Sequence, residues 1–184
     1  MSQVPIFVAL LRGVNVGKAK RVPMAELRAL LFDLGYTGVA TLLNSGNAVF
    51  CAPTGTPLEH SATIAAAISS RLKVEVPVIV KSARELEAII SENPIDAAVH
   101  QHSSFLVAFT QDTKALSGLA AMESLVVPPE KFAVGKHAAY LLCAAGILES
   151  EAAESLLGKA GKPATTRNWA TVLKLQALAG ERDA

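Results

Sequence analysis

Apolar runs that are typical of strands alternate with stretches of helical periodicity in the first part of the chain. Residues 6–11 are continuously apolar and rich in branched side chains, which indicates a buried central strand. Leucines then recur at helical spacing between Leu27 and Leu34. Pro23 suits the first helical position, where its missing N–H costs nothing, and Gly35 is a C-terminal stop signal. A strand followed by a helix is therefore predicted.

A strand hairpin, a second helix and an edge strand are expected next. Short strands are predicted at 37–43 and 47–52, joined by a tight turn. Pro57 opens the following helix, and the apolar run at 74–80 contains a proline, which places that strand at a sheet edge. The order strand, helix, strand, strand, helix, strand is that of a ferredoxin-like unit.

The second half of the chain repeats most of this scheme. After a helix at 83–91 and a looser connector, the apolar run 105–110 has the same character as 6–11. The elements expected after it are a helix at 113–122, strands at 131–134 and 138–143, and helices at 150–159 and 167–179. No fourth strand is expected. The predicted fold class is α+β, with two ferredoxin-like halves, the second lacking its last strand and closed by a C-terminal helix.

The composition is that of a folded protein with a packed core, which agrees with the two predicted halves. Of the 184 residues 51% are hydrophobic and 18% are charged, which excludes a disordered chain. The predicted domains are a ferredoxin-like N-terminal half at 1–82, a connecting helix and linker at 83–103, and a second α+β half with its C-terminal helix at 104–184.

The net charge and the cysteines indicate which partners and which cellular compartment to expect. The chain has 17 basic and 16 acidic residues, so no global field would attract nucleic acid or an anionic membrane, and any basic patch must be local. The start of the chain lacks the basic region of a signal peptide. The two cysteines, Cys51 and Cys143, lie in apolar runs and are interpreted as free thiols in a reducing compartment. We expect a cytoplasmic protein with no membrane partner.

Two polar loops are expected to meet at one edge of the first sheet. In a ferredoxin-like unit the first strand ends where the second strand turns into the third, and the first helix starts at the same edge. We call this edge the rim, formed by the glycine loop (residues 12–18) and the hairpin loop (residues 44–47), with Lys20 and Arg21 close by. The candidate ligand-binding residues there are Arg12, Gly13, Asn15, Gly17, Lys18, Asn44, Ser45, Gly46 and Asn47.

The rim has the chemistry of an anion site. Glycines let a ligand approach the backbone, and helix N–H groups and cations favour negative charge. Arg12 directly follows a buried strand, so its charge needs a carboxylate or a ligand anion as partner. The alternative interpretation is structural: the glycines permit a turn and the asparagines cap the hairpin.

The glycine loop is not a Walker phosphate loop. That motif needs four residues between its glycines and Ser or Thr after the lysine. Here three residues separate Gly13 from Gly17, and Ala19 follows Lys18.

A second polar cluster lies at 165–169 in the tail. Thr166 is a plausible helix N-cap and Trp169 a core anchor, which together form a structural motif. Arg167 and Asn168 are less expected in a first helical turn, where acidic residues are favoured. They either pair with other parts of the protein or complete the anion site.

No catalytic or metal-binding residue can be assigned. His100 and His102 have no third ligand nearby in the sequence, and no zinc spacing exists. No Ser–His–Asp or Cys–His arrangement can be identified. Whether the protein is an enzyme, and with which cofactor, is left open.

Four motifs together resemble domain-of-unknown-function family 1697. They are Arg12-Gly13-Val14-Asn15-Val16-Gly17, Val22-Pro23-Met24-Ala25-Glu26-Leu27-Arg28, Ser45-Gly46-Asn47-Ala48-Val49-Phe50 and Thr165-Thr166-Arg167-Asn168-Trp169. The resemblance runs from about Ile6 to Leu175. It implies a bacterial protein with an α+β fold that contains ferredoxin-like halves, and it brings no established activity. Where members often have a second glycine this chain has Lys18, and Glu151 replaces a lysine of the family pattern.

Four function hypotheses remain. The first is a protein that binds an anionic small molecule or nucleotide at the rim. The second is a nucleic-acid-binding module, because ferredoxin-like sheets host RNA-binding domains, although those expose aromatic residues and strand 6–11 offers only Phe7. The third is an enzyme that uses the rim without a metal, although the sequence supplies no evident general base and only Glu26 lies close to it. The fourth is a structural or interaction protein with no ligand. The oligomeric state is not predicted.

Overall fold

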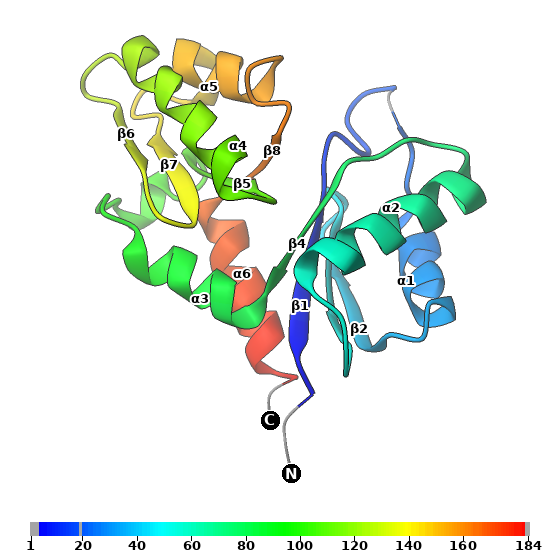
Figure 1. The fold of residues 1–184 in the computed structure, drawn as a ribbon. Helices are drawn as coiled ribbons and strands as arrows, with labels where there is room; N and C mark the ends of the chain where they lie inside the picture. Colours follow the sequence, from blue (N-terminus) through cyan, green and yellow to red (C-terminus); the bar gives the residue numbers. More distant parts are fainter. Residues whose placement is uncertain (1–3, 19, 183–184) are drawn as a thin grey trace. The chain divides into compact units, whose positions relative to one another are not determined.

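A computed structural model describes residues 4–18 and 20–182 of the chain (Figure 1). These residues form two four-stranded antiparallel sheets. They divide into two compact units: the first takes the chain up to Leu86 together with the segment from Leu175 onward, and the second takes Glu87–Lys174. The mixed fold with two ferredoxin-like halves is confirmed, while the domain boundaries at 82 and 103 stay predictions.

The first unit has the predicted order of elements. They are β1 (Ile6–Leu11), α1 (Met24–Asp33), β2 (Thr37–Leu42), β3 (Asn47–Cys51), α2 (Pro57–Leu72) and β4 (Val78–Ser82). The strand order in the sheet is β2-β3-β1-β4, so β1 is central and fully buried, and β4 lies at an edge, both as predicted. Helices α1 and α2 cover one face, where alternate β1 residues such as Phe7 and Leu11 join their leucines and isoleucines in one core (Figure 1).

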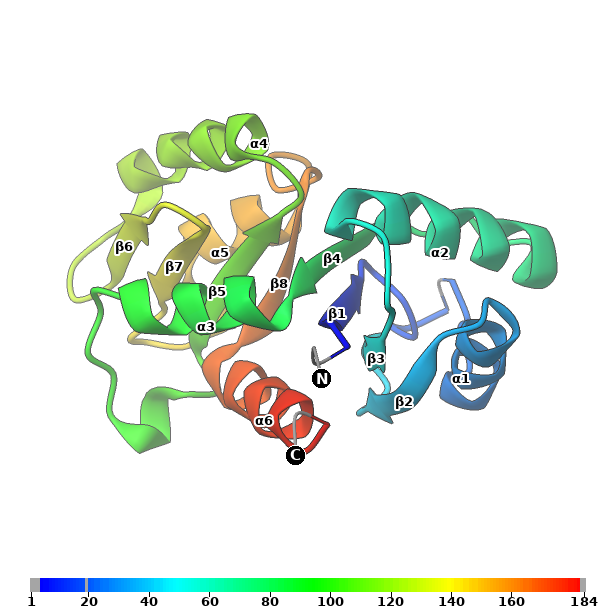
Figure 2. The same cartoon turned by 60° about the horizontal axis from the view of Figure 1, so that its bottom comes forward.

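The second unit completes its sheet. Its elements are the 3₁₀ turn Val99–Gln101, β5 (Phe105–Thr110), α4 (Thr113–Gly118), the 3₁₀ helix Leu119–Leu125, β6 (Lys131–Val134), β7 (Ala138–Leu142), the 3₁₀ turn Ile147–Glu149, α5 (Glu151–Leu157) and β8 (Ala164–Asn168). Helices α3 (Ala83–Glu92) and α6 (Trp169–Gly180) each run from one unit into the other. Figure 2 shows the strands in the order β6-β7-β5-β8.

The prediction that the second half lacks its last strand is wrong. Residues 164–168 form β8, which pairs antiparallel with β5 through Ala108 opposite Thr166. Two β-branched threonines in a row favour a strand, but this segment is short and polar and resembles a helix start. Pairing with the buried strand β5 decides its conformation.

Two helix starts also differ from expectation. Helix α6 begins at Trp169, and its cap is Asn168, whose Oδ1 accepts a hydrogen bond of 2.9 Å from the amide of Thr171, so Thr166 is not the N-cap. Helix α1 begins at Met24, with Pro23 immediately before it. Pro57 does open α2, where Thr56 and Glu59 form a capping box.

Both cysteines are free thiols, as predicted. Burial raises the pKa of the Cys143 thiol to about 11. The helices among the described residues are too short or too polar to cross a membrane. A cytoplasmic location stays a prediction.

His60 of α2 is buried in an aromatic cluster of the first unit. Its ring contacts Phe7, Tyr36 and Phe50, with ring centroids 4.5, 5.2 and 5.4 Å away. The Tyr36 hydroxyl lies 2.9 Å from Nδ1, while Nε2 has no hydrogen bond within the described part of the chain. Burial lowers the pKa of His60, and this effect outweighs the opposing influence of the Glu59 carboxylate and the Thr54 backbone.

We therefore expect stability to fall as the pH drops below about 6.5, the ordinary pKa of histidine. In that range the unfolded chain binds a proton at His60 that the folded chain does not, so unfolding is favoured until the pH reaches the lowered folded pKa. The slope from one proton is at most about 1.4 kcal/mol per pH unit. Urea unfolding at pH 7.5 and 5.5 should show this slope reduced in His60→Phe and unchanged in His100→Gln. Equal slopes in all three proteins would contradict the prediction.

Candidate functional site

The glycine loop is held in shape by the side chain of Asn15. Its Nδ2 donates to the carbonyls of Val22, at 2.8 Å, and Asn44, at 2.7 Å, and its Oδ1 accepts from the amide of Val22 at 2.9 Å. The backbone amide of Asn15 donates to the carbonyl of Lys20 at 3.0 Å. One side chain thus closes the segment 15–22 on itself and ties it to the hairpin loop.

A close backbone approach also joins the end of β1 to the hairpin loop. The amide of Leu11 donates to the carbonyl of Gly46 at 2.8 Å. A Cβ atom at Gly46 would lie 2.6 Å from Cβ of Leu11 and 2.7 Å from Cγ2 of Val14, so a side chain there would clash. These contacts confirm that the glycine loop and the hairpin loop meet at one edge of the sheet, as the topology predicted.

Asn47 is a structural residue of the hairpin. It is fully buried, and its Nδ2 donates to the carbonyl of Leu42 at 3.0 Å and to Oγ of Ser45 at 2.9 Å. The carboxamides of both Asn15 and Asn47 are therefore engaged in holding the loops together. These two side chains therefore have a structural role in the fold.

Positive charge is concentrated on and after the glycine loop. Arg12, Lys18, Lys20 and Arg21 provide four cations, and the next acidic residue along the chain is Glu26. Lys18, Lys20 and Arg21 are exposed, whereas Arg12 is half-buried, and burial lowers the pKa of its guanidinium. The backbone amide of Arg12 donates to the carbonyl of Pro77 at 2.9 Å. The rim is thus a local basic patch on a protein of net charge +1.

Arg167 and Asn168 belong to the second unit. The Arg167 side chain is buried and donates to Oγ1 of Thr165, at 2.9 Å, and to the carbonyl of Thr166, at 2.7 Å. Burial lowers its pKa to about 10. Asn168 caps α6. Both residues have structural contacts in this unit, and their participation in the rim stays a prediction.

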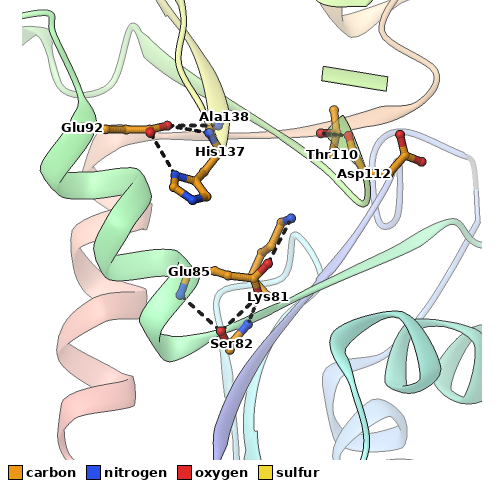
Figure 3. Close-up of polar contacts among 8 residues, drawn as sticks. All are labelled: Lys81, Ser82, Glu85, Glu92, Thr110, Asp112, His137 and Ala138. Carbon is orange, nitrogen blue, oxygen red and sulfur yellow. Dashed lines mark hydrogen bonds and ion pairs between the residues drawn. The ribbon is translucent and has the colours of Figure 1, made fainter. Parts of the chain in front are cut away.

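A third polar cluster was not predicted from the sequence. Glu92, at the end of α3, accepts hydrogen bonds from the amides of Lys136, His137 and Ala138 and from Nδ1 of His137, at 2.8–3.2 Å. Figure 3 shows those that come from His137 and Ala138. The Tyr140 hydroxyl lies 3.0 Å from the same carboxylate. Burial alone would raise the pKa of Glu92, but these donors outweigh it and the pKa is lowered. The Glu92 carboxylate therefore stabilises the turn between β6 and β7.

Lys81 and Glu85 form a smaller polar group in the first unit, also drawn in Figure 3. Lys81 is buried on β4, and its Nζ lies 3.6 Å from a carboxylate oxygen of Glu85. The other oxygen of Glu85 accepts from the amide of Ser82 at 2.7 Å, and Oγ of Ser82 accepts from the amide of Glu85 at 3.2 Å. These reciprocal bonds are a capping box that starts α3.

The remaining sites offer little chemistry. A hollow of about 340 Å³ in the second unit lies against α4, with Asp112 and Lys114 in its wall. Asp112 is the N-cap of α4, accepting from the amide of Ala115 at 2.7 Å. No group of three His, Cys, Asp or Glu residues able to hold a metal ion occurs among the residues that the structure describes.

Comparison with known proteins places the chain by fold and by family. The conserved bacterial protein SP0830 from Streptococcus pneumoniae matches with a TM-score of 0.73 and 24% sequence identity, over 96% of this chain and 99% of that chain. At this identity the likeness shows the fold alone. No curated protein matches the chain. The profile of a family described as a protein of unknown function, DUF1697, matches residues 4–140. This is more than half of the sequence, so the chain belongs to the DUF1697 family.

Proposed function

We propose that the protein binds a phosphate-bearing small molecule at the rim, with the glycine loop as its anion site. The observation that carries this proposal is the backbone of the loop. Gly13, Asn15 and Gly17 have φ values of 64°, 58° and 57°, and the intervening Val14 and Val16 do not have positive φ. Where left-handed residues alternate with right-handed helical ones, successive N–H groups turn toward a common concavity, the nest that binds anions in many phosphate sites. The three left-handed residues of this loop supply one half of that pattern.

Amide donors remain for a ligand in this loop. Within residues 4–18 and 20–182, the backbone amides of Gly13, Val16, Gly17 and Lys18 donate no hydrogen bond. The Asn15 side chain ties the loop to Val22 and Asn44 through three hydrogen bonds, so the loop is already partly ordered before a ligand arrives. A site that is already ordered pays little conformational entropy on binding.

The positive charge of the rim also favours an anion. Lys18, Lys20 and Arg21 are exposed and Arg12 is half-buried, with no acidic residue before Glu26. Charge-assisted hydrogen bonds from such groups to phosphate are about twice as strong as neutral ones. Burial lowers the pKa of Arg12, because it disfavours the charged form of the guanidinium.

The test is a titration of ¹⁵N-labelled protein with inorganic phosphate and with pyrophosphate. We expect the amide resonances of Gly13, Gly17 and Lys18 to shift in a saturable way. Arg12→Ala should weaken binding by about tenfold, which corresponds to about 1.4 kcal/mol for one charge-assisted contact. Lys174→Ala, an exposed lysine on α6 of the second unit, is the matched control and should leave the affinity unchanged. If neither anion shifts these amides, the glycine loop is not an anion site.

A nucleic-acid-binding role is less well supported by the same unit. RNA-binding ferredoxin-like domains stack bases on aromatic side chains that stand exposed on the central strands. Phe7, the one aromatic residue of β1, is buried in the core beneath α1 and α2 and stacks on Phe50. A titration with single-stranded RNA at low salt tests this alternative, because strong salt-sensitive binding would reverse the ranking.

A further inference from the structure

We infer that the ligand of the rim is a phosphate monoester with an apolar organic group, and that Val16 and Leu43 contact that group. This assignment rests on the proposed function and names the class of ligand for the same site. Three features of the two side chains support it: their exposure, the backbone conformation of Leu43, and their position beside the glycine loop.

The two valines of the glycine loop differ in their exposure. Val14 is buried, and its Cγ2 would lie 2.7 Å from a Cβ atom at Gly46 of the hairpin loop. Val16 is 68% exposed. Removal of a valine side chain from water is favourable, and the fold provides this for Val14 alone. Val16 is therefore open to an apolar contact that a ligand can supply.

Leu43 is strained as well as exposed. Its φ is 57°, in the left-handed region, and its side chain is 51% exposed. This conformation costs free energy for a bulky residue, whereas glycine and asparagine adopt it more readily. The hairpin therefore needs the backbone conformation but not a leucine. Strained residues of this kind cluster at binding sites, and an apolar contact with a ligand gives the leucine a role that the turn does not.

The two side chains belong to neighbouring parts of the rim. Val16 follows Asn15, Leu43 precedes Asn44, and Nδ2 of Asn15 donates to the carbonyl of Asn44 at 2.7 Å. Each is thus one residue away from the hydrogen bond that joins the two loops. Exposed apolar residues scattered singly are ordinary on a protein surface, but these two flank a loop proposed to bind phosphate. An apolar group attached to that phosphate is the ligand chemistry that this pair fits.

The experiment measures dissociation constants for inorganic phosphate, glycerol 3-phosphate, n-butyl phosphate and AMP by the amide shifts of Gly13 and Gly17. The glycerol and butyl esters carry the same charged group on chains of similar length, so they differ mainly in polarity. We expect n-butyl phosphate to bind at least about tenfold more tightly than glycerol 3-phosphate, since each methylene removed from water is worth up to about fourfold in affinity. The methyl resonances of Val16 and Leu43 should shift with the butyl ester, while those of Leu58, exposed on α2, should not.

Leu43→Asn separates binding from folding. Asparagine tolerates the left-handed conformation, so the melting temperature should rise by about 2–4 °C. The preference for the butyl ester over the glycerol ester should fall to within about threefold, while the affinity for inorganic phosphate stays unchanged. Leu58→Gln is the matched control and should leave the preference as it is. A melting temperature that falls with the preference intact would assign Leu43 to the fold and overturn its contact with the ligand.

The outcomes also separate this assignment from the proposed function. If the two esters bind equally, or if AMP binds more than about tenfold more tightly than the butyl ester, the apolar contact is overturned while the anion site stands. If no anion shifts the amides, both are overturned. Sedimentation with vesicles that contain phosphatidic acid then identifies the source of the ester. Binding to these vesicles as well as to the butyl ester indicates a lipid headgroup, and binding to the butyl ester alone indicates a free ligand; both results support the apolar contact.

Discussion

Replacing Glu92 by glutamine should lower the free energy of unfolding by about 2–4 kcal/mol. The reason is that a partly buried carboxylate loses hydrogen bonds that satisfy both of its oxygens. Its two oxygens accept from three backbone amides, a ring nitrogen and a hydroxyl. Glutamine retains one of the two acceptor oxygens and presents an NH₂ group to donors, so amides of the β6–β7 turn lose their partner. Urea unfolding followed by circular dichroism measures the loss, and Glu87→Gln, exposed on the same helix, should change the stability by less than about 0.5 kcal/mol.

The same variant has a pH signature. The pKa of Glu92 is lowered in the folded protein, so the unfolded chain binds a proton at this residue before the folded chain does. The stability that Glu92 contributes is therefore complete above about 4.5, its ordinary pKa, and is lost as the pH falls through the folded pKa. The difference between the wild type and Glu92→Gln should shrink over that range. A difference that stays constant down to pH 3 would show that the carboxylate charge does not stabilise the turn.

Gly46→Ala should destabilise the protein by about 2–5 kcal/mol, the largest effect expected at the rim. Two costs add: alanine at a φ of 82° costs about 1–2 kcal/mol, and overpacking costs about 1–3 kcal/mol. The second cost arises because the new Cβ would lie 2.6 Å from Cβ of Leu11 and 2.7 Å from Cγ2 of Val14. The loops would have to separate, so the amide shifts of the glycine loop should change as well.

Gly13→Ala is the matched control for this effect. Gly13 has a similar left-handed φ of 64°, but nothing lies within 4 Å of a Cβ placed there. It should cost only the backbone term of about 1–2 kcal/mol. Urea unfolding of both variants measures the difference, which isolates the close approach of the two loops. Equal losses would mean that the glycine loop and the hairpin loop are not pressed together as the structure has them.

Local sequence pattern was sufficient for the strands that are buried on both faces. β1 and β5 have the predicted bounds, because a strand that is buried on both faces is a continuous apolar run that ends where polar residues begin. It was not sufficient for β8, whose residues 164–168 include threonines, an arginine and an asparagine. That segment is a strand because it pairs with β5, and a pairing partner far away in the chain leaves no mark on local periodicity.

The candidate site was likewise predicted in part from the sequence and in part only from the structure. Topology alone predicted that the glycine loop and the hairpin loop meet, since the connections of a ferredoxin-like unit place both at one edge. It did not predict that the carboxamides of Asn15 and Asn47 would be consumed in holding the loops, nor that Lys20 would fold back onto Asn15. Those assignments depend on φ angles and hydrogen bonds that any glycine- and asparagine-rich turn could arrange differently.

By itself the sequence determined the order of elements in the ferredoxin-like first half, the family and the cluster of cations after β1, because each of these depends on residues close together in the chain. Only the tertiary structure decided the fourth strand of the second sheet, the stacking of Phe7 on Phe50 and the role of Glu92, whose partner His137 is 45 residues away. A carboxylate in a helix or connector is unremarkable until the fold brings a turn of amides to it. The physical reason is the same in each case, since these interactions join groups that become neighbours only when the chain has folded.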